Sequence, residues 1–286
     1  MGAQAHGRIP WAGMRSPAVP LQLRAFIIGL IGGSFGGLVG LGGGVVMVPL
    51  FTLWAGLSQH EAHGTSLTAV IVTGAVGGWL YANHGHVSWS SAGWLAAASV
   101  VASFITAQYA ARLPGARLKK FFGAFLLVVA VMLLVRGLLP LADGGQSQPM
   151  IGVLLVIGAV AGAIAGLLGV GGGVLIVPLL VLGTGLSQHV AQGTSLAALI
   201  LTGVTGTLVY ARHGHLRKDV LVPLLPGVVL GSLIGGHGAV GISGPALRVL
   251  FALVLIWLGA RYTGFNSAVR LPRLGTHKSP PLVRQK

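Results

Sequence analysis

Long apolar stretches separated by short polar loops make up most of the chain. Six of these stretches have about the 20 residues that one helix needs to cross a hydrocarbon core roughly 30 Å thick. Two longer stretches, 23–57 and 152–186, carry a glycine run in the middle. The pattern predicts an all-α polytopic membrane protein. The six single crossings are expected at 59–82, 92–112, 118–139, 188–211, 221–241 and 247–263.

The glycine runs predict a break in both longer stretches. Residues 37–50 read GLVGLGGGVVMVPL and residues 166–179 read GLLGVGGGVLIVPL. A glycine inside a helix costs about 1 kcal/mol relative to alanine, and Pro49 and Pro178 each remove a backbone donor. We expect the first stretch to split at 38–44 into a hairpin or a pair of short helices. Each half then has a Gly-broken first segment or hairpin plus three transmembrane helices, or about 8–10 membrane segments in the chain.

The two halves of the chain repeat each other. A shift of 129 residues aligns them without a gap, and 42–86 is identical to 171–215 at 28 of 45 positions. A duplication of this extent predicts two repeats with the same fold. It also predicts that the glycine break has one copy in each repeat.

Basic residues change sides between the two halves. Loop 112–120 carries four Lys and Arg residues and its counterpart 241–248 carries one, whereas 212–219 carries three and its counterpart 83–91 carries none. Because cytoplasmic loops hold the basic residues, equivalent loops face opposite sides of the membrane, which predicts two inverted repeats. Both termini are then cytoplasmic, in a multi-pass protein of the cell inner (plasma) membrane. The expected parts are a disordered basic N-terminus 1–22, a first repeat 23–140, a linker 141–151, a second repeat 152–263 and a disordered basic tail 264–286.

Composition excludes several classes of protein. Only 7% of the residues are charged, against about 25% in soluble domains. The net charge of +15 comes from Lys and Arg in the termini and short loops, so we expect membrane lipid and no nucleic acid as partner. There is no cysteine, and the carboxylates Glu61, Asp143 and Asp219 all fall near loops or helix caps. We therefore expect no catalytic residue, no cofactor and no enzyme activity. We also expect no metal, because the histidines of HEAH (60–63) are three residues apart rather than the four of the zinc motif.

The glycine runs are candidate parts of an anion site. They do not fit a nucleotide cradle, because Val45 stands where G-x-G-x-x-G needs its third glycine. A broken helix exposes backbone N–H groups that attract anions. The GTSL copies at 64–67 and 193–196 supply hydroxyl groups one to two turns inside the next helix, which we expect to begin at the capping box Ser58-x-x-Glu61. The predicted site, near the membrane midplane, consists of Gly42, Gly43, Gly44, Thr65, Ser66, Gly171, Gly172, Gly173, Thr194 and Ser195.

The same residues also fit two purely structural roles. Consecutive glycines allow close packing of helices. Thr and Ser side chains inside a helix can bond to carbonyl groups of their own helix. The sequence leaves both roles open beside the anion site.

Polar residues near the helix ends are candidate gates or proton relays. One set recurs at the predicted starts of two helices, where a solvated helix cap explains it equally well. A second pair falls inside the third segments, where polar side chains can line a path. The His-Gly-His copies at 84–86 and 213–215 fit an interfacial polar cap or a proton relay. The gating or proton-relay candidates are Gln59, His60, Gln188, His189, Gln108 and His237.

The duplicated motifs resemble a known transporter family. A GLxGxGGGxxxVP stretch, then LSxxxAxGTSL, then YxxHGH, each present twice, is similar to the TauE/SafE sulfite exporter family (TSUP membrane transporters). The resemblance covers about residues 23–263. It implies a secondary transporter of small sulfur-containing anions, such as sulfite, sulfoacetate or other organosulfonates, in a bacterial or archaeal inner membrane.

The resemblance and the scarcity of carboxylates together favour an exporter that works by alternating access between the repeats. Moving a monoanion outward down an inside-negative potential releases about 2.3 kcal/mol per 100 mV, so export needs no buried Asp/Glu relay. An anion channel or an importer of the same substrates is the alternative, and a non-transporting membrane scaffold is a third. The sequence leaves the oligomeric state open.

Overall fold

The computed structural model describes residues 19–110, 150–168 and 171–263, with isolated positions between 124 and 135, and this part of the chain is helical without a strand. The predicted all-α fold is therefore confirmed. Much of the predicted segment 118–139, the basic loop 112–120, most of the linker and the far termini lie outside the described residues. The described helices are α1 (Leu21–Val39), α2 (Gly44–Leu50), a π-helix η1 (Phe51–Ala55), α3 (Gln59–Asn83), α4 (Trp89–Ala110), α6 (Ile151–Leu168), α7 (Gly173–Thr184), α8 (Gln188–Arg212), α9 (Lys218–Gly241) and α10 (Gly244–Thr263).

The chain divides into two compact units. One comprises Met1–Arg112 and Pro140–Leu247 and holds α1 to α4 and α6 to α9. The other comprises Leu113–Leu139 and Arg248–Lys286 and holds most of α10. The glycine breaks and the helices around them lie entirely in the first unit.

Five of the described helices are long and apolar enough to cross a membrane. They are α1, α3, α4, α8 and α9. Four correspond to crossings expected from the sequence, and α1 is the first part of the glycine-broken stretch. Helices of 12 residues or fewer, such as α7, reach only about 18 Å at 1.5 Å per residue, too short to span the core alone.

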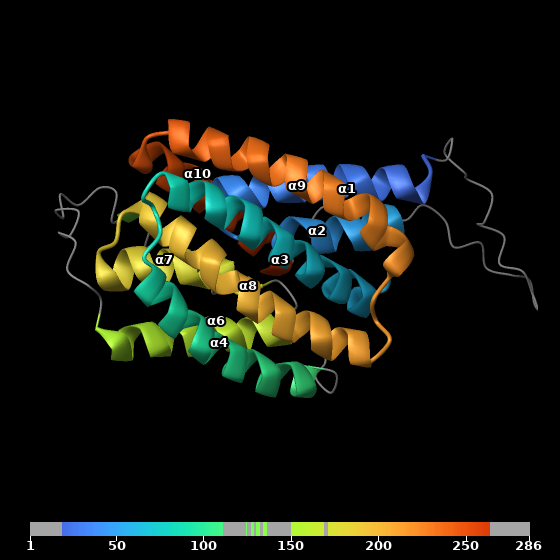
Figure 1. Cartoon of the computed structure of the whole chain (residues 1–286), viewed down its shortest axis with the longest axis horizontal. Coiled ribbons are helices and arrows are strands. Elements are labelled where there is room, and N and C mark those ends of the chain that lie inside the picture. The colour runs from blue at the N-terminus through green and yellow to red at the C-terminus, as the bar shows by residue number, and fades with distance from the viewer. Residues whose placement is uncertain are drawn as a thin grey trace, which may run out of the picture. The chain divides into compact units, whose positions relative to one another are not determined.

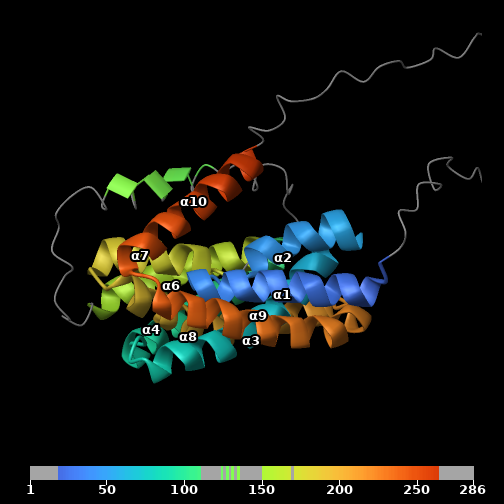
Figure 2. The ribbon, with the colours of Figure 1, turned by 90° about the horizontal axis from the view of Figure 1, so that it is seen from above.

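The first glycine break is the turn of a helical hairpin. Gly40 ends α1 with φ 77°, and Gly42 and Gly43 have φ 76° and 78° before α2 begins. Only glycine adopts this left-handed region without strain. The returning segment, α2 and η1, lies along α1 (Figure 2), and the Arg24 guanidinium donates a hydrogen bond to the carbonyl of Trp54 at 2.9 Å. The chain therefore comes back to the end from which α1 started.

Helices from the two repeats pair reciprocally. α1 packs on α9, and α6 packs on α4, while α3 and α8 contact each other between these pairs (Figure 1). The shift of 129 residues converts α1 into α6 and α4 into α9, so each pair is the counterpart of the other. Every one of these contacts joins the first repeat to the second, so neither repeat forms the bundle alone.

Small residues bring the paired helices into backbone contact. A Cβ added to Gly33 or Gly37 of α1 would lie 2.5 Å and 2.7 Å from the backbone oxygens of Val228 and Ser232 of α9. A Cβ on Gly158 of α6 would likewise lie 2.5 Å from the backbone oxygen of a residue in α4. This is the small-residue packing of membrane helices, and it explains many of the glycines outside the breaks.

The central helices α3 and α8 run antiparallel. Gly74 of α3 faces Leu196 of α8, and Gly203 of α8 faces Leu67 of α3. These are two copies of one contact, because 67 and 74 correspond to 196 and 203 in the repeat. Corresponding helices therefore start at opposite ends of the bundle.

Candidate functional site

The two glycine breaks meet where α3 and α8 cross. A Cβ on Gly42 would lie 2.9 Å from Val70 of α3, and one on Gly171 would lie 3.0 Å from the same side chain. A Cβ on Gly173 would lie 3.0 Å from the backbone of Leu41 in the other break. Two loops of left-handed backbone, one from each repeat, therefore lie against each other inside the bundle. The predicted glycines of both repeats share one region.

A buried hydrogen-bond group from both repeats surrounds the first break. Ser195 of α8 donates to the carbonyl oxygen of Gly40 at 3.0 Å. The Tyr81 hydroxyl at the end of α3 donates to Oε1 of Gln192 at 3.0 Å and approaches the carbonyl oxygen of Gly37 at 3.3 Å. Both Ser195 and Gln192 have no exposed surface. The second repeat thus binds the turn of the first repeat directly.

The counterpart group differs in one residue. Tyr210 corresponds to Tyr81, and His63 corresponds to Gln192. The Tyr210 hydroxyl lies 3.4 Å from Nδ1 of His63, and the two rings meet edge to face with their centroids 6.1 Å apart. Each tyrosine thus links the end of one central helix to the start of the other, once through an amide and once through an imidazole.

The sequence alone did not single out these four polar residues as a site. The signal was present, because Tyr-Ala recurs at 81–82 and 210–211 while His63 and Gln192 differ inside a nearly identical stretch. Their meeting across the repeats depends on the antiparallel crossing, which no local pattern encodes.

The predicted hydroxyl groups take four different roles. Ser195 reaches the carbonyl oxygen of Gly40 in the first break. Ser66 donates to the carbonyl oxygen of His63 at 3.0 Å, a bond within its own helix. Thr194 accepts a hydrogen bond from the backbone N–H of Ser88 at 3.0 Å and so binds the loop after α3. Thr65 is fully buried, and its Oγ1 has no partner among the described residues.

Several buried polar atoms of this region lack partners within the described part of the chain. Nε2 of Gln192 is one of them, and the Gln192 side chain lies against Gly40 in the first break. Oγ1 of Thr65 and both amide atoms of Gln188 are others, near the starts of α3 and α8. Leaving a buried donor or acceptor unpaired costs about 1–3 kcal/mol, and such groups are rare in native proteins. A free donor beside a helix break is suited to bind an anion that has shed water.

Two of the gate candidates pair with the His-Gly-His loops. The rings of His60 and His215 stack with centroids 5.0 Å apart, and those of His189 and His86 stack at 5.2 Å. These two pairs are counterparts in the repeat and lie at opposite ends of the antiparallel helices. Burial lowers the pKa of His86, and the neighbouring His189 and His84 lower it further.

The remaining gate candidates are placed differently from one another. Gln108 lines a pocket with His60, whereas His237 is exposed and its Nδ1 lies 2.8 Å from the carbonyl oxygen of Leu233 in its own helix. Gln188 is buried at the start of α8. The side chain of Gln59 lies outside the described residues.

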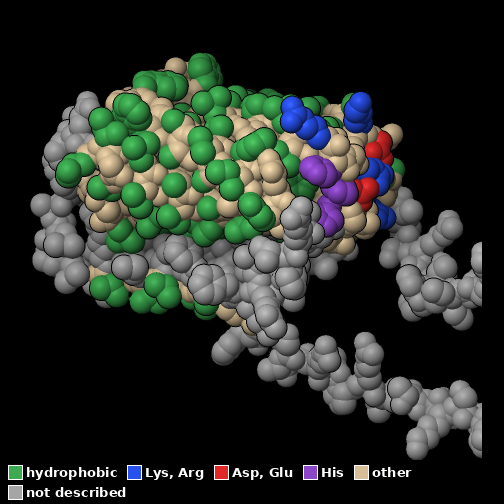
Figure 3. Space-filling model, turned by 90° about the horizontal axis from the view of Figure 1, so that it is seen from below, with side chains coloured by type: hydrophobic (Ala, Val, Ile, Leu, Met, Phe, Trp, Pro, Cys, Tyr) green, Lys and Arg blue, Asp and Glu red, His purple; other side chains and the backbone are tan. Residues whose placement is uncertain are grey.

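Charged residues gather at the end of the bundle where α3 starts, here called the charged end: Glu61, Arg212, Arg217, Lys218 and Asp219. Arg217 binds Asp219 at 2.6 Å and Glu61 at 3.3 Å, and these bonds raise the pKa of the Arg217 guanidinium. Ser58 and Glu61 form the predicted capping box, which is confirmed. On the face in Figure 3, histidine side chains lie beside charged side chains at one end, and away from that end the described surface there shows only hydrophobic and uncharged atoms.

Comparison with known proteins decides the family. The family model described as "Sulfite exporter TauE/SafE" matches residues 25–262. The chain belongs to the TauE/SafE sulfite exporter family. As a family member with five helices suited to cross a membrane, it is a multi-pass membrane transporter.

Curated relatives of this family member are described as probable membrane transporter proteins. The chain is 32% identical over 234 residues to one from Xylella fastidiosa (strain 9a5c), and the aligned part covers 80% of this chain and 89% of that one. It is 27% identical over 266 residues to the probable membrane transporter protein YunE of Bacillus subtilis (strain 168), and the aligned part covers 84% of this chain and 97% of YunE. No solved structure matches the chain significantly.

Proposed function

We propose that the chain is a secondary transporter that exports small sulfur-containing anions, such as sulfite, sulfoacetate or other organosulfonates, by alternating access between two inverted repeats. One observation carries the proposal: two glycine breaks, one from each repeat, meet inside the bundle, and beside them Nε2 of Gln192 has no partner among the described residues. Irregular backbone at membrane depth is tolerated where it lines a cavity or is buried in protein. The description of the matching family supports the substrate class.

The proposed substrate site is built from dipoles rather than charges. Backbone N–H groups of Gly42–Gly44 and Gly171–Gly173 would face the anion, together with hydroxyls of Thr65, Ser66, Thr194 and Ser195. To donate to the anion, Ser66 and Ser195 would first release the carbonyl oxygens of His63 and Gly40. Among the described residues, the carboxylates Glu61 and Asp219 lie away from it at the charged end, where both bind Arg217. A site of this kind binds an anion without a fixed buried cation, so the anion can also leave. We infer that the chain performs transport rather than catalysis.

The antiparallel arrangement supports alternating access. Each stacked histidine pair ties the start of one central helix to the loop after the other, so parting one pair loosens one end of the bundle only. We assign His60 and His189 to these two gates, with Gln59, Gln188, Gln108 and His237 as further gate or relay residues. The repeats are 23–140 and 152–263, and both termini face the cytoplasm of a cell whose inner membrane holds the protein.

Counterflow in proteoliposomes tests this function. Vesicles with the purified full chain are loaded with unlabelled sulfite, sulfoacetate, thiosulfate, taurine or sulfate, and entry of the labelled compound is followed. A carrier predicts that internal substrate accelerates labelled entry, because the loaded site returns faster than the empty one. Flux without this acceleration identifies a channel, and no flux with any of these compounds contradicts transport of this class. An imposed inside-negative potential should drive the anion out, and uptake against it would indicate an importer.

A further inference from the structure

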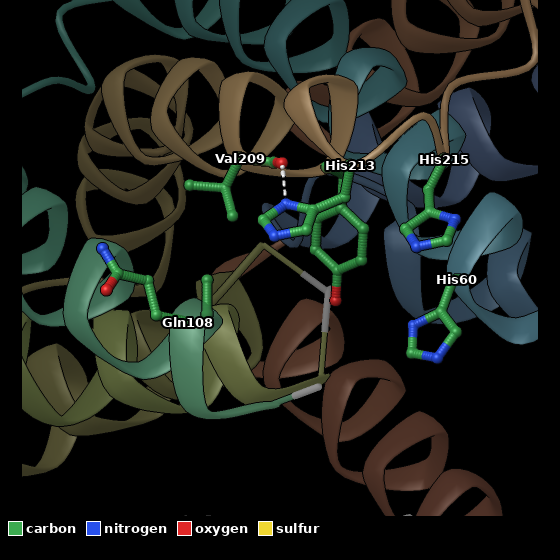
Figure 4. A pocket seen from close by; sticks show the side chains of 7 residues that line it. His60, Gln108, Val209, His213 and His215 are labelled. Carbon is green, nitrogen blue, oxygen red and sulfur yellow. Dashed lines mark hydrogen bonds between the residues drawn. The ribbon is translucent and has the colours of Figure 1, made fainter. Parts of the chain in front are cut away.

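A pocket of about 90 Å³ opens at the charged end, next to the pair of Tyr210 and His63. A single buried water needs only about 10–15 Å³ of such space, so the pocket can hold an oxyanion of a few heavy atoms. We call it the histidine pocket. Figure 4 shows His60 and His215 side by side, with Gln108 on the opposite side of the pocket. It is lined by His60, Ala107, Gln108, Val209, Tyr210, His213 and His215.

The polar lining consists of groups that can donate hydrogen bonds to an anion. Nδ1 of His213 lies 2.8 Å from the carbonyl oxygen of Val209, which can only accept, so Nδ1 carries the hydrogen (Figure 4). The second nitrogen of His213 then becomes a donor when the ring gains a proton, and the ring becomes a cation. His213 and His215 lie parallel with centroids 6.5 Å apart, and His60 stacks on His215. Charged rings this close repel each other, and an anion among them removes the repulsion.

The charged side chains on the helices beside the pocket favour an anion as its ligand. They are Glu61 at the start of α3, Arg212 at the end of α8, and Arg217, Lys218 and Asp219 at the start of α9. The other titratable side chains there are His63 of α3 and Tyr109 of α4. Both carboxylates are held by Arg217. The described surroundings therefore carry a net positive charge before any histidine is protonated, and no carboxylate lines the pocket.

The counterpart region at the other end differs in its contacts. Nε2 of His189, which corresponds to His60, lies 3.2 Å and 3.1 Å from the carbonyl oxygens of Ala239 and Ile242. These carbonyl oxygens therefore engage Nε2 of His189, which is then not available to an anion. Loop 83–91 carries no Lys or Arg. The two ends thus share the stacked pair but not the positive surroundings.

We propose that the histidine pocket is a second anion-binding site, a one-sided vestibule that takes a small oxyanion such as sulfite or sulfate from the charged end before it passes Tyr210 toward the glycine breaks. The binding can be measured by itself, whereas the vestibule role rests on the proposed transport.

Calorimetric titration of the purified full chain with sodium sulfate tests the binding. The pocket variant H213Q/H215Q is compared with its counterpart H84Q/H86Q, and H60Q with H189Q. We expect the wild type to bind sulfate. Each pocket variant should lose about tenfold in affinity, as for removal of a charge-assisted hydrogen bond, and each counterpart should change less than about twofold. No binding by the wild type, binding only of anionic lipid, or equal losses in both sets would overturn the site.

Sided vesicles test the vestibule role. In inside-out vesicles the pocket variants should raise KM for sulfite about tenfold with little change in maximal rate. In right-side-out vesicles KM should stay within about twofold, because the anion then enters from the other end. Equal effects in both orientations would overturn the vestibule. Absence of flux from wild-type vesicles would contradict the proposed transport instead, and the calorimetric result would still decide the site.

Discussion

The two tyrosine contacts at the crossing show what duplication kept and what it changed. Tyr81 and Tyr210 hold equivalent places at the ends of the central helices, but one binds Gln192 and the other lies against His63. The Tyr81 hydroxyl also approaches the carbonyl oxygen of Gly37. The contact through His63 lies at the charged end, which carries Arg217. At the other end, the residue equivalent to Arg217 is Ser88. The scaffold and breaks are nearly symmetric, whereas the ion pairs of Arg217 lie at one end only.

The largest expected effect comes from the glycines, which the two repeats share. A valine at Gly43 would stand at φ 78° with its Cβ against the carbonyl oxygen of Gly32, so G43V should lower the free energy of unfolding by about 3 kcal/mol or more and abolish transport. G172V should do nearly as much, because its φ is 75° and a Cβ would lie 2.9 Å from the oxygen of Ala161. Denaturant unfolding in detergent and flux assays measure both.

The matched control for this prediction is G85A. Gly85 also has a positive φ, 73°, but a Cβ there meets nothing within 4 Å. It should cost only about 1–2 kcal/mol of backbone strain and leave flux largely intact. Equal behaviour of G85A and G43V would show that backbone strain alone matters, and not the close approach of Gly43 to Gly32.

Removal of the two tyrosine hydroxyls should lower the free energy of unfolding by different amounts. Y81F removes the hydrogen-bond donor of Oε1 of Gln192, next to an Nε2 that has no partner among the described residues, and should cost about 1–3 kcal/mol. Y210F breaks a longer contact of 3.4 Å and should cost about 1 kcal/mol or less. Thermal unfolding of the two variants measures the difference. A larger loss for Y210F would contradict the asymmetry.

Stability at the other end should respond to acid through His86. Its pKa is lowered in the folded protein by burial and by His189 and His84, so the unfolded chain binds the proton more readily. The stabilisation is fully present above the ordinary histidine pKa of about 6.5, and it is lost as the pH falls from there through the lowered pKa of folded His86. H86Q should therefore flatten the fall of melting temperature between about pH 7 and 5.5. An unchanged slope would contradict this assignment.

The smallest expected effect is that of the ion pairs at the charged end. Arg217 is 37% exposed and its partner Glu61 27%, and exposed pairs contribute about 0–1 kcal/mol. R217Q should change the melting temperature little while weakening sulfate binding in the histidine pocket. A large loss of stability would mean that the pair holds the two repeats together.

Local features of the fold could be predicted from the sequence, and long-range ones could not. The break was expected at 38–44, and the turn lies at Gly40–Gly43, because three glycines and a proline leave few other conformations. The capping box at Ser58 was equally local. Three contacts join residues far apart in the chain, and no periodicity encodes them. They are the pairing of α1 with α9, the Tyr81–Gln192 bond and the hydrogen bond between Thr194 and Ser88.

The most direct test of the central claim uses single cysteines, since the natural chain has none. S195C replaces the hydroxyl that binds Gly40 in the first break. Alternating access predicts that a membrane-impermeant thiol reagent modifies it from either side of sided vesicles, and that the anion identified by counterflow slows both reactions. Modification from one side only, or a rate that the anion does not change, would contradict a shared site at the two breaks.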